Sequence, residues 1–65
     1  MNNLTFGQFC NELVNLYKVR EGMTGDQSRR YVLDALDYFK QDYDDGYSPQ
    51  ESYQIDVDNW GESNV

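Results

Sequence analysis

The sequence contains no histidine, one cysteine, one proline and only five basic side chains among 65 residues. The absence of histidine removes the commonest transition-metal ligand and the usual general base near neutral pH. Because Cys10 is the only cysteine, no disulfide can form within the chain. These absences argue against a catalytic site, and we expect a non-enzymatic protein without metal or other cofactors.

Long hydrophobic runs are also missing. The first residues, 1–5, lack the basic start and apolar run of a secretory signal, and no later stretch is long enough for a membrane span. We therefore expect a soluble, cytoplasmic protein that does not contact a membrane. A chain this short buries only roughly 60% of the surface that its unfolded form exposes. Residues 1–60 are predicted to form one small domain that gains stability by association, for example as a homodimer, and residues 61–65 are predicted to be a disordered tail.

Acidic side chains outnumber basic ones by twelve to five, which gives a formal net charge of −7. The excess lies in the second half of the chain. Residues 34–65 carry nine acidic side chains and one basic one, whereas residues 1–33 carry three acidic and four basic ones. This charge disfavours direct binding to nucleic acid or to anionic membrane, because both would repel it. A basic protein surface is the natural counterpart.

A first helix is predicted over about residues 5–21. Thr5 and Gln8 have the spacing of a capping box, in which each side chain satisfies a free backbone N–H of the first turn. The apolar residues that follow share one arc of a helical wheel: Phe6, Phe9, Cys10, Leu13, Val14, Leu16 and Tyr17. One face is therefore expected to be buried. Gly22 can adopt the left-handed conformation that ends a helix.

A second helix is predicted over about residues 25–44 by the same pattern. Thr24 and Gln27 have the capping-box spacing again, and Gly46 marks the end of the helix. The expected core face consists of Val32, Ala35, Leu36, Phe39 and Tyr43. Because the connection between the two helices is short, an all-α fold built on an antiparallel αα-hairpin is predicted.

The segment 47–60 permits two interpretations. Its Ser-Pro-Gln-Glu run at 48–51 has a serine cap, a proline at the first helical position and a glutamate at the third, which indicates a helix start. Residues 53–58, however, alternate apolar and polar side chains, which is typical of a strand. We expect a short third helix that begins at Pro49 and passes into an extended segment packed on the hairpin.

The run from Asp42 to Gly46 resembles the beginning of a calcium-binding EF-hand loop. With Gly46 at the sixth loop position, the first, third and twelfth positions are Gln41, Tyr43 and Ser52. The carboxylates that calcium requires at these positions are missing. The sequence therefore predicts no specific calcium site.

The candidate functional surface is a stripe of tyrosines and aspartates beside the core face of the second predicted helix. Aspartates near the C-terminus of a helix oppose its dipole, and a stability cost of this kind is typical of functional surface. Together with acidic and aromatic residues further along the chain, the candidate partner-binding residues are Tyr31, Asp34, Asp37, Tyr38, Asp42, Asp44, Asp45, Asp56, Asp58 and Trp60. In the alternative interpretation, the tyrosines only border the core and the aspartates only keep the protein soluble.

These features predict a small acidic regulator or inhibitor that occupies the basic surface of a nucleic-acid-handling protein. Tyrosines beside carboxylates can stack against arginine and lysine side chains, and an extended acidic ridge could imitate a phosphate backbone. An analogy with small acidic phage proteins rests on charge, size and tyrosine content alone. The alternative function is a non-catalytic scaffold or homo-oligomerising module that acts through apolar surface.

Overall fold

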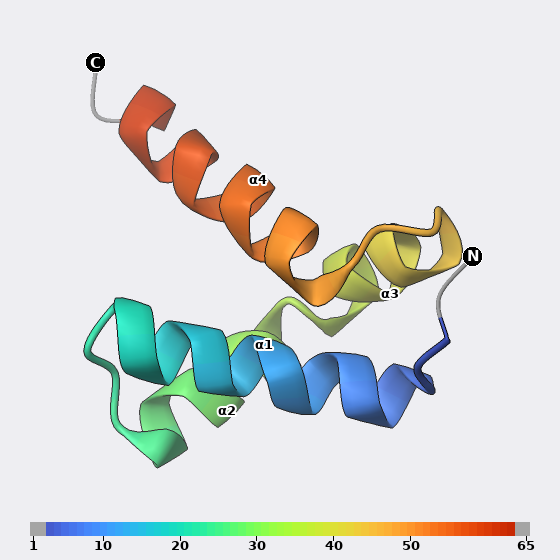
Figure 1. Cartoon of the computed structure of the whole chain (residues 1–65). Helices are drawn as coiled ribbons and strands as arrows, with labels where there is room; N and C mark the ends of the chain where they lie inside the picture. Colours follow the sequence, from blue (N-terminus) through green and yellow to red (C-terminus); the bar gives the residue numbers. More distant parts are fainter. Residues whose placement is uncertain (1–2, 64–65) are drawn as a thin grey trace.

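The computed structural model describes residues 3–63, and all regular secondary structure in this range is helical. The four helices are α1 (Phe6–Arg20), α2 (Gly25–Asp34), α3 (Leu36–Asp44) and α4 (Pro49–Ser63). α1 packs against α2 and α4 and also contacts α3. Figure 1 shows α4 above α1 and inclined to it, and α2 behind and below α1. The predicted all-α architecture, a helical hairpin with a C-terminal element packed on it, is confirmed.

The capping residues expected from the sequence begin α1 and α2. In α1, the Gln8 backbone N–H donates to the Thr5 side chain at 3.2 Å, and the Thr5 backbone N–H donates to the Gln8 side chain at 2.9 Å. Thr24 and Gln27 form the same pair of hydrogen bonds at the start of α2. Gly22 follows α1 with a φ of +71°, the left-handed conformation that glycine adopts most readily. Both helices of the predicted hairpin therefore begin at the predicted caps, and the first helix ends before Gly22 as predicted.

The second predicted helix is divided into two. Ala35, with φ −111° and ψ 28°, separates α2 from α3, so residues 25–44 do not form one continuous helix. The segment contains no proline, and its only glycine is the first helical residue, so local sequence does not explain the division. Tertiary packing does, because the bend carries Phe39 into the core and Tyr43 against the Phe9 ring of α1.

The C-terminal segment is more helical than expected. α4 runs from Pro49 to Ser63, so the predicted passage into extended chain is wrong. The Ser48 and Glu51 side chains each accept a hydrogen bond from the backbone N–H of the other residue, which starts the helix. The alternation of residues 53–58 has no neighbouring strand to pair with in the described part of the chain. Residues 61–63 of the predicted disordered tail belong to α4, and residues 64 and 65 lie outside the described residues.

The core is mainly aromatic and centres on Tyr17, which is fully buried. Its ring contacts rings from each of the other three helices, with centroid distances from 4.8 to 6.2 Å. These rings belong to Tyr31 of α2, Phe39 of α3, and Tyr53 and Trp60 of α4. Tyr17 therefore joins all four helices. Within residues 3–63, no helix combines the length and the apolar character that crossing a membrane requires.

Candidate functional site

The candidate partner-binding residues fall into two groups in the structure. One group has internal hydrogen-bond partners and consists of Tyr31, Asp42, Asp56 and Trp60. The other group is exposed and consists of Asp34, Asp37, Tyr38, Asp44, Asp45 and Asp58. The stripe expected on a single long helix is therefore split, because the bend at Ala35 changes the direction of α3 relative to α2.

Asp56 joins three helices by accepting two tyrosine hydroxyls on one carboxylate oxygen. The Tyr17 hydroxyl donates to Asp56 Oδ2 at 2.6 Å, and the Tyr31 hydroxyl donates to the same atom at 2.5 Å. Trp60 Nε1 in turn donates to the Tyr31 hydroxyl at 3.1 Å. Burial, together with the hydrogen bond to Asp56, raises the pKa of Tyr31 to about 12. The same two causes raise the pKa of Tyr17, so both phenols remain hydrogen-bond donors near neutral pH.

Asp42 also has an internal role. Its side chain is largely buried, with 9% of the residue surface exposed, and Oδ2 accepts a hydrogen bond from Ser52 Oγ at 2.7 Å. Ser52 is fully buried, so this pair links α3 to α4 away from solvent. A further link to α4 comes from the Tyr53 hydroxyl, which donates to a carboxylate oxygen of Glu21. Carboxylates thus stabilise the position of α4 at several points along its length.

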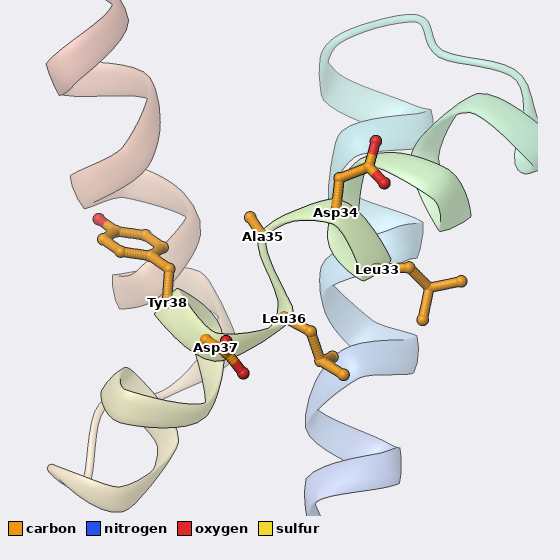
Figure 2. A pocket seen from close by; sticks show the side chains of 6 residues that line it. All are labelled: Leu33, Asp34, Ala35, Leu36, Asp37 and Tyr38. Atoms are coloured by element: carbon orange, nitrogen blue, oxygen red, sulfur yellow. The ribbon is translucent and has the colours of Figure 1, made fainter.

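Three of the six residues of the exposed group lie at the junction of α2 and α3. Asp34, Asp37 and Tyr38 line an open hollow there together with Leu33, Ala35 and Leu36 (Figure 2). Figure 2 shows Leu33 and Leu36 pointing to one side of the junction and the Tyr38 ring lying toward α4. Leu33 is 59% exposed, which is high for a large apolar side chain, and Tyr38 is 39% exposed. Acidic, aromatic and aliphatic side chains therefore border one hollow, and its six lining residues are here called the junction surface.

The carboxylates of the junction surface form no ion pair within 4.0 Å among the described residues, although Arg30 lies one helical turn before Asp34. The two ion pairs found in residues 3–63 join Arg29 to Asp26 at 3.7 Å and Lys40 to Asp44 at 2.7 Å. Neither pair includes Asp34 or Asp37.

The other exposed candidate acids lie apart from the junction surface. Asp44 pairs with Lys40, Asp45 follows the end of α3, and Asp58 of α4 accepts a hydrogen bond from Gln54 at 2.9 Å. The structure thus brings Asp34, Asp37 and Tyr38 together and leaves Asp44, Asp45 and Asp58 as separate negative charges.

Sequence reasoning missed the apolar part of the junction surface. Leu33 lies next to Val32 of the core face and points outward, where it contributes little to the buried core. An aliphatic residue at an outward helical position was the available signal. Sequence reasoning also missed Tyr17 as a hydrogen-bond donor, because a tyrosine on a buried helix face is normally read only as core.

The described residues include no group of three or more histidine, cysteine, aspartate or glutamate side chains placed to hold a metal ion. Cys10 is half-buried, and this burial raises the pKa of its thiol. Comparison of the chain with protein-family models, with curated proteins and with solved structures found no match.

Proposed function

We propose that this protein is a non-catalytic binding protein that regulates or inhibits a partner by occupying a basic surface of that partner. The observation that carries the proposal is the junction surface, where Asp34 and Asp37 are exposed without an ion-pair partner among the described residues. These carboxylates stand beside exposed apolar groups, most of all Leu33. A surface of this composition fits arginine and lysine side chains better than any other class of group.

The fit follows from the structure of the basic side chains. A guanidinium or ammonium group forms short, charge-assisted hydrogen bonds with carboxylates. The hydrocarbon stems of arginine and lysine pack on apolar surface while the charged end remains in a polar environment. Leu33 offers such a surface, and the ring face of Tyr38 can add a cation–π contact. The two carboxylates would then orient the basic groups of the partner.

The net charge of −7 adds a long-range contribution. Nine acidic side chains and one basic side chain in residues 34–65 produce a field that attracts a cationic surface and accelerates encounter. Proteins that bind nucleic acid carry surfaces of the required kind, because they neutralise phosphates with lysine and arginine. We therefore propose a nucleic-acid-handling protein as the partner, with the acidic surface taking the place of nucleic-acid phosphates.

The test is affinity capture with charge-matched baits. One bait carries Asp34→Asn with Asp37→Asn, and the control bait carries Glu12→Gln with Asp26→Asn, so both lose two negative charges from exposed positions. Wild-type and control baits should capture the same proteins from a cell lysate at low salt, and the junction variant should lose them. High salt and added duplex DNA should release the captured proteins. Equal capture by the two double variants would refute a role for the junction surface, and partners indifferent to duplex DNA would refute mimicry.

Exposed apolar side chains support a second candidate function, a scaffold or homo-oligomerising module. Val19 is 71% exposed and Leu33 is 59% exposed, although both belong to helices with a well-buried opposite face. Association through these side chains would persist at high salt, because burial of apolar surface is not screened by ions. Leu33→Ser should then abolish association that Asp34→Asn leaves intact, which distinguishes this function from the first.

A further inference from the structure

The bend between α2 and α3 lies in a segment whose local sequence favours a straight helix. Ala35, the residue at the bend, has the highest helix propensity of any amino acid, and neither proline nor an internal glycine interrupts residues 26–44. The residues of the expected core face recur at helical spacing across the bend, from Val32 to Phe39. The bend is thus a feature of the packed molecule and has no cause in the segment itself.

Backbone hydrogen bonding also favours a straight helix over the bend. The Ala35 N–H reaches Tyr31 O at 3.3 Å, and the regular pattern resumes where the Phe39 N–H donates to Ala35 O at 3.1 Å. Between these two bonds lie the first-turn amides of α3, residues 36–38. First-turn amides have no acceptor within their own helix, and α3 has no side-chain cap to supply one. A straight helix would give each of these amides a carbonyl of α2 as its acceptor.

Straightening is opposed by contacts that α3 and α4 make with α1 and with Leu4, which precedes α1. Phe39 packs on Tyr17 with ring centroids 6.2 Å apart, and the Tyr43 hydroxyl donates to the carbonyl of Leu4 at 2.6 Å. Asp56 accepts the Tyr17 hydroxyl, as described above. All of these contacts join residues before Ala35 to residues after it.

A straight α2–α3 helix could not keep these contacts within one chain. The Tyr17 ring packs on Tyr31 of α2 with centroids 4.8 Å apart, and the Tyr31 and Phe39 rings lie 6.5 Å apart across the bend. Phe39 is eight residues after Tyr31, so in a straight helix the two residues would be separated by about 12 Å along the axis at 1.5 Å per residue, and Tyr17 could not contact both. The site beside Tyr17 would then be empty. The side chain with the matching shape and position is Phe39 of a second copy of the chain.

We infer that residues 25–44 can straighten into one helix about Ala35, and that α3 and α4 then pack on α1 and α2 of a second copy. The resulting exchanged dimer keeps the core contacts of the monomer, now formed between chains, and gains helical hydrogen bonds at both bends. Exchange of identical elements is a low-cost route to a dimer because no new interface has to be formed. The inference does not depend on the proposed function, since it uses none of the exposed carboxylates.

The experiment compares Ala35→Gly with wild type and with Arg29→Gly as the matched control. Glycine disfavours the helix at position 35 in the straight form but is tolerated in the bent form, where residue 35 is not helical. Arg29 is exposed and helical in both forms, so its replacement should not change the dimer equilibrium. Glycine at each of the two bends should raise the dimer dissociation constant by a factor of roughly five, so Ala35→Gly should raise it by about 25-fold in total.

The measurement is light scattering coupled to size-exclusion chromatography over a wide range of protein concentration. Isotope-labelled and unlabelled chains are then unfolded together, refolded and examined by NMR for contacts between chains. Wild type should form a dimer at high concentration, with intermolecular contacts between Tyr17 and Phe39. A monomer at every concentration, a dimer without that contact, or equal weakening by Ala35→Gly and Arg29→Gly would each overturn the inference.

Discussion

Replacing Asp56 with alanine would remove the oxygen that two tyrosine hydroxyls share between three helices. A hydrogen bond to a charged group contributes about 1.5–3 kcal/mol to stability, and the partly buried position of this pair favours the lower end of that range. Two such bonds would contribute about 3 kcal/mol. A chain of this length has a free energy of unfolding of only about 3–10 kcal/mol. Asp56→Ala should therefore lose a large fraction of the total stability.

The matched control is Asp58→Ala, which removes the same charge from an exposed position on the same helix and gains the same helix propensity. Urea unfolding followed by far-ultraviolet circular dichroism and by Trp60 fluorescence gives the free energy of each variant. We expect Asp56→Ala to be less stable than Asp58→Ala by about 3 kcal/mol, with a melting temperature lower by roughly 12–24 °C. A difference below about 0.5 kcal/mol, the usual limit for surface substitutions, would show that the tyrosine–carboxylate network does not stabilise the docked α4.

Three further outcomes follow from the structure. The unfolded chain should release the Tyr31 proton near the ordinary tyrosine pKa of about 10, whereas the folded chain retains it up to about 12. The contribution of Tyr31 to stability should therefore be intact below the pKa of the unfolded chain and should be lost as the pH rises toward the pKa of the folded chain. Alkaline unfolding of Tyr31→Phe should show a weaker decline. Asp42→Ala should cost about 1–3 kcal/mol in urea unfolding because it leaves the buried Ser52 hydroxyl without its acceptor, while Asp45→Ala at an exposed position should have little effect. Thr24→Ala should cost about 1 kcal/mol through loss of the α2 cap, and full stability in that variant would contradict the role of the capping box.

Local features of the sequence were sufficient to predict the starts of α1, α2 and α4. Each start depends on side chains three residues apart that satisfy one another's backbone groups, so the signal and the structure occupy the same few residues. The hairpin follows from the short connection that contains Gly22. The bend at Ala35 could not be predicted in this way, because its cause is the packing of Phe39 on distant residues of α1.

The candidate site was predictable only in part, for the same reason. The spacing of the stripe assumed one straight helix, and the bend moved Asp42 into contact with Ser52. Asp56 was chosen for its charge, but its carboxylate lies within reach of the hydroxyls of buried Tyr17 and partly buried Tyr31 and accepts a hydrogen bond from each. Asp34, Asp37 and Tyr38 remain exposed because they lie at the bend itself, where no other helix covers the chain completely.

The missing cap of α3 sets this helix apart from its three neighbours. Helices α1, α2 and α4 each begin with a side-chain cap, so their first turns are stabilised before the tertiary structure is complete. α3 has nine residues and no side-chain cap, and nine residues are too few for a stable isolated helix in water. Its separation from α2 at Ala35 depends on the surfaces that α1 and α4 present, so a binding partner that alters either surface would also change the orientation of α3.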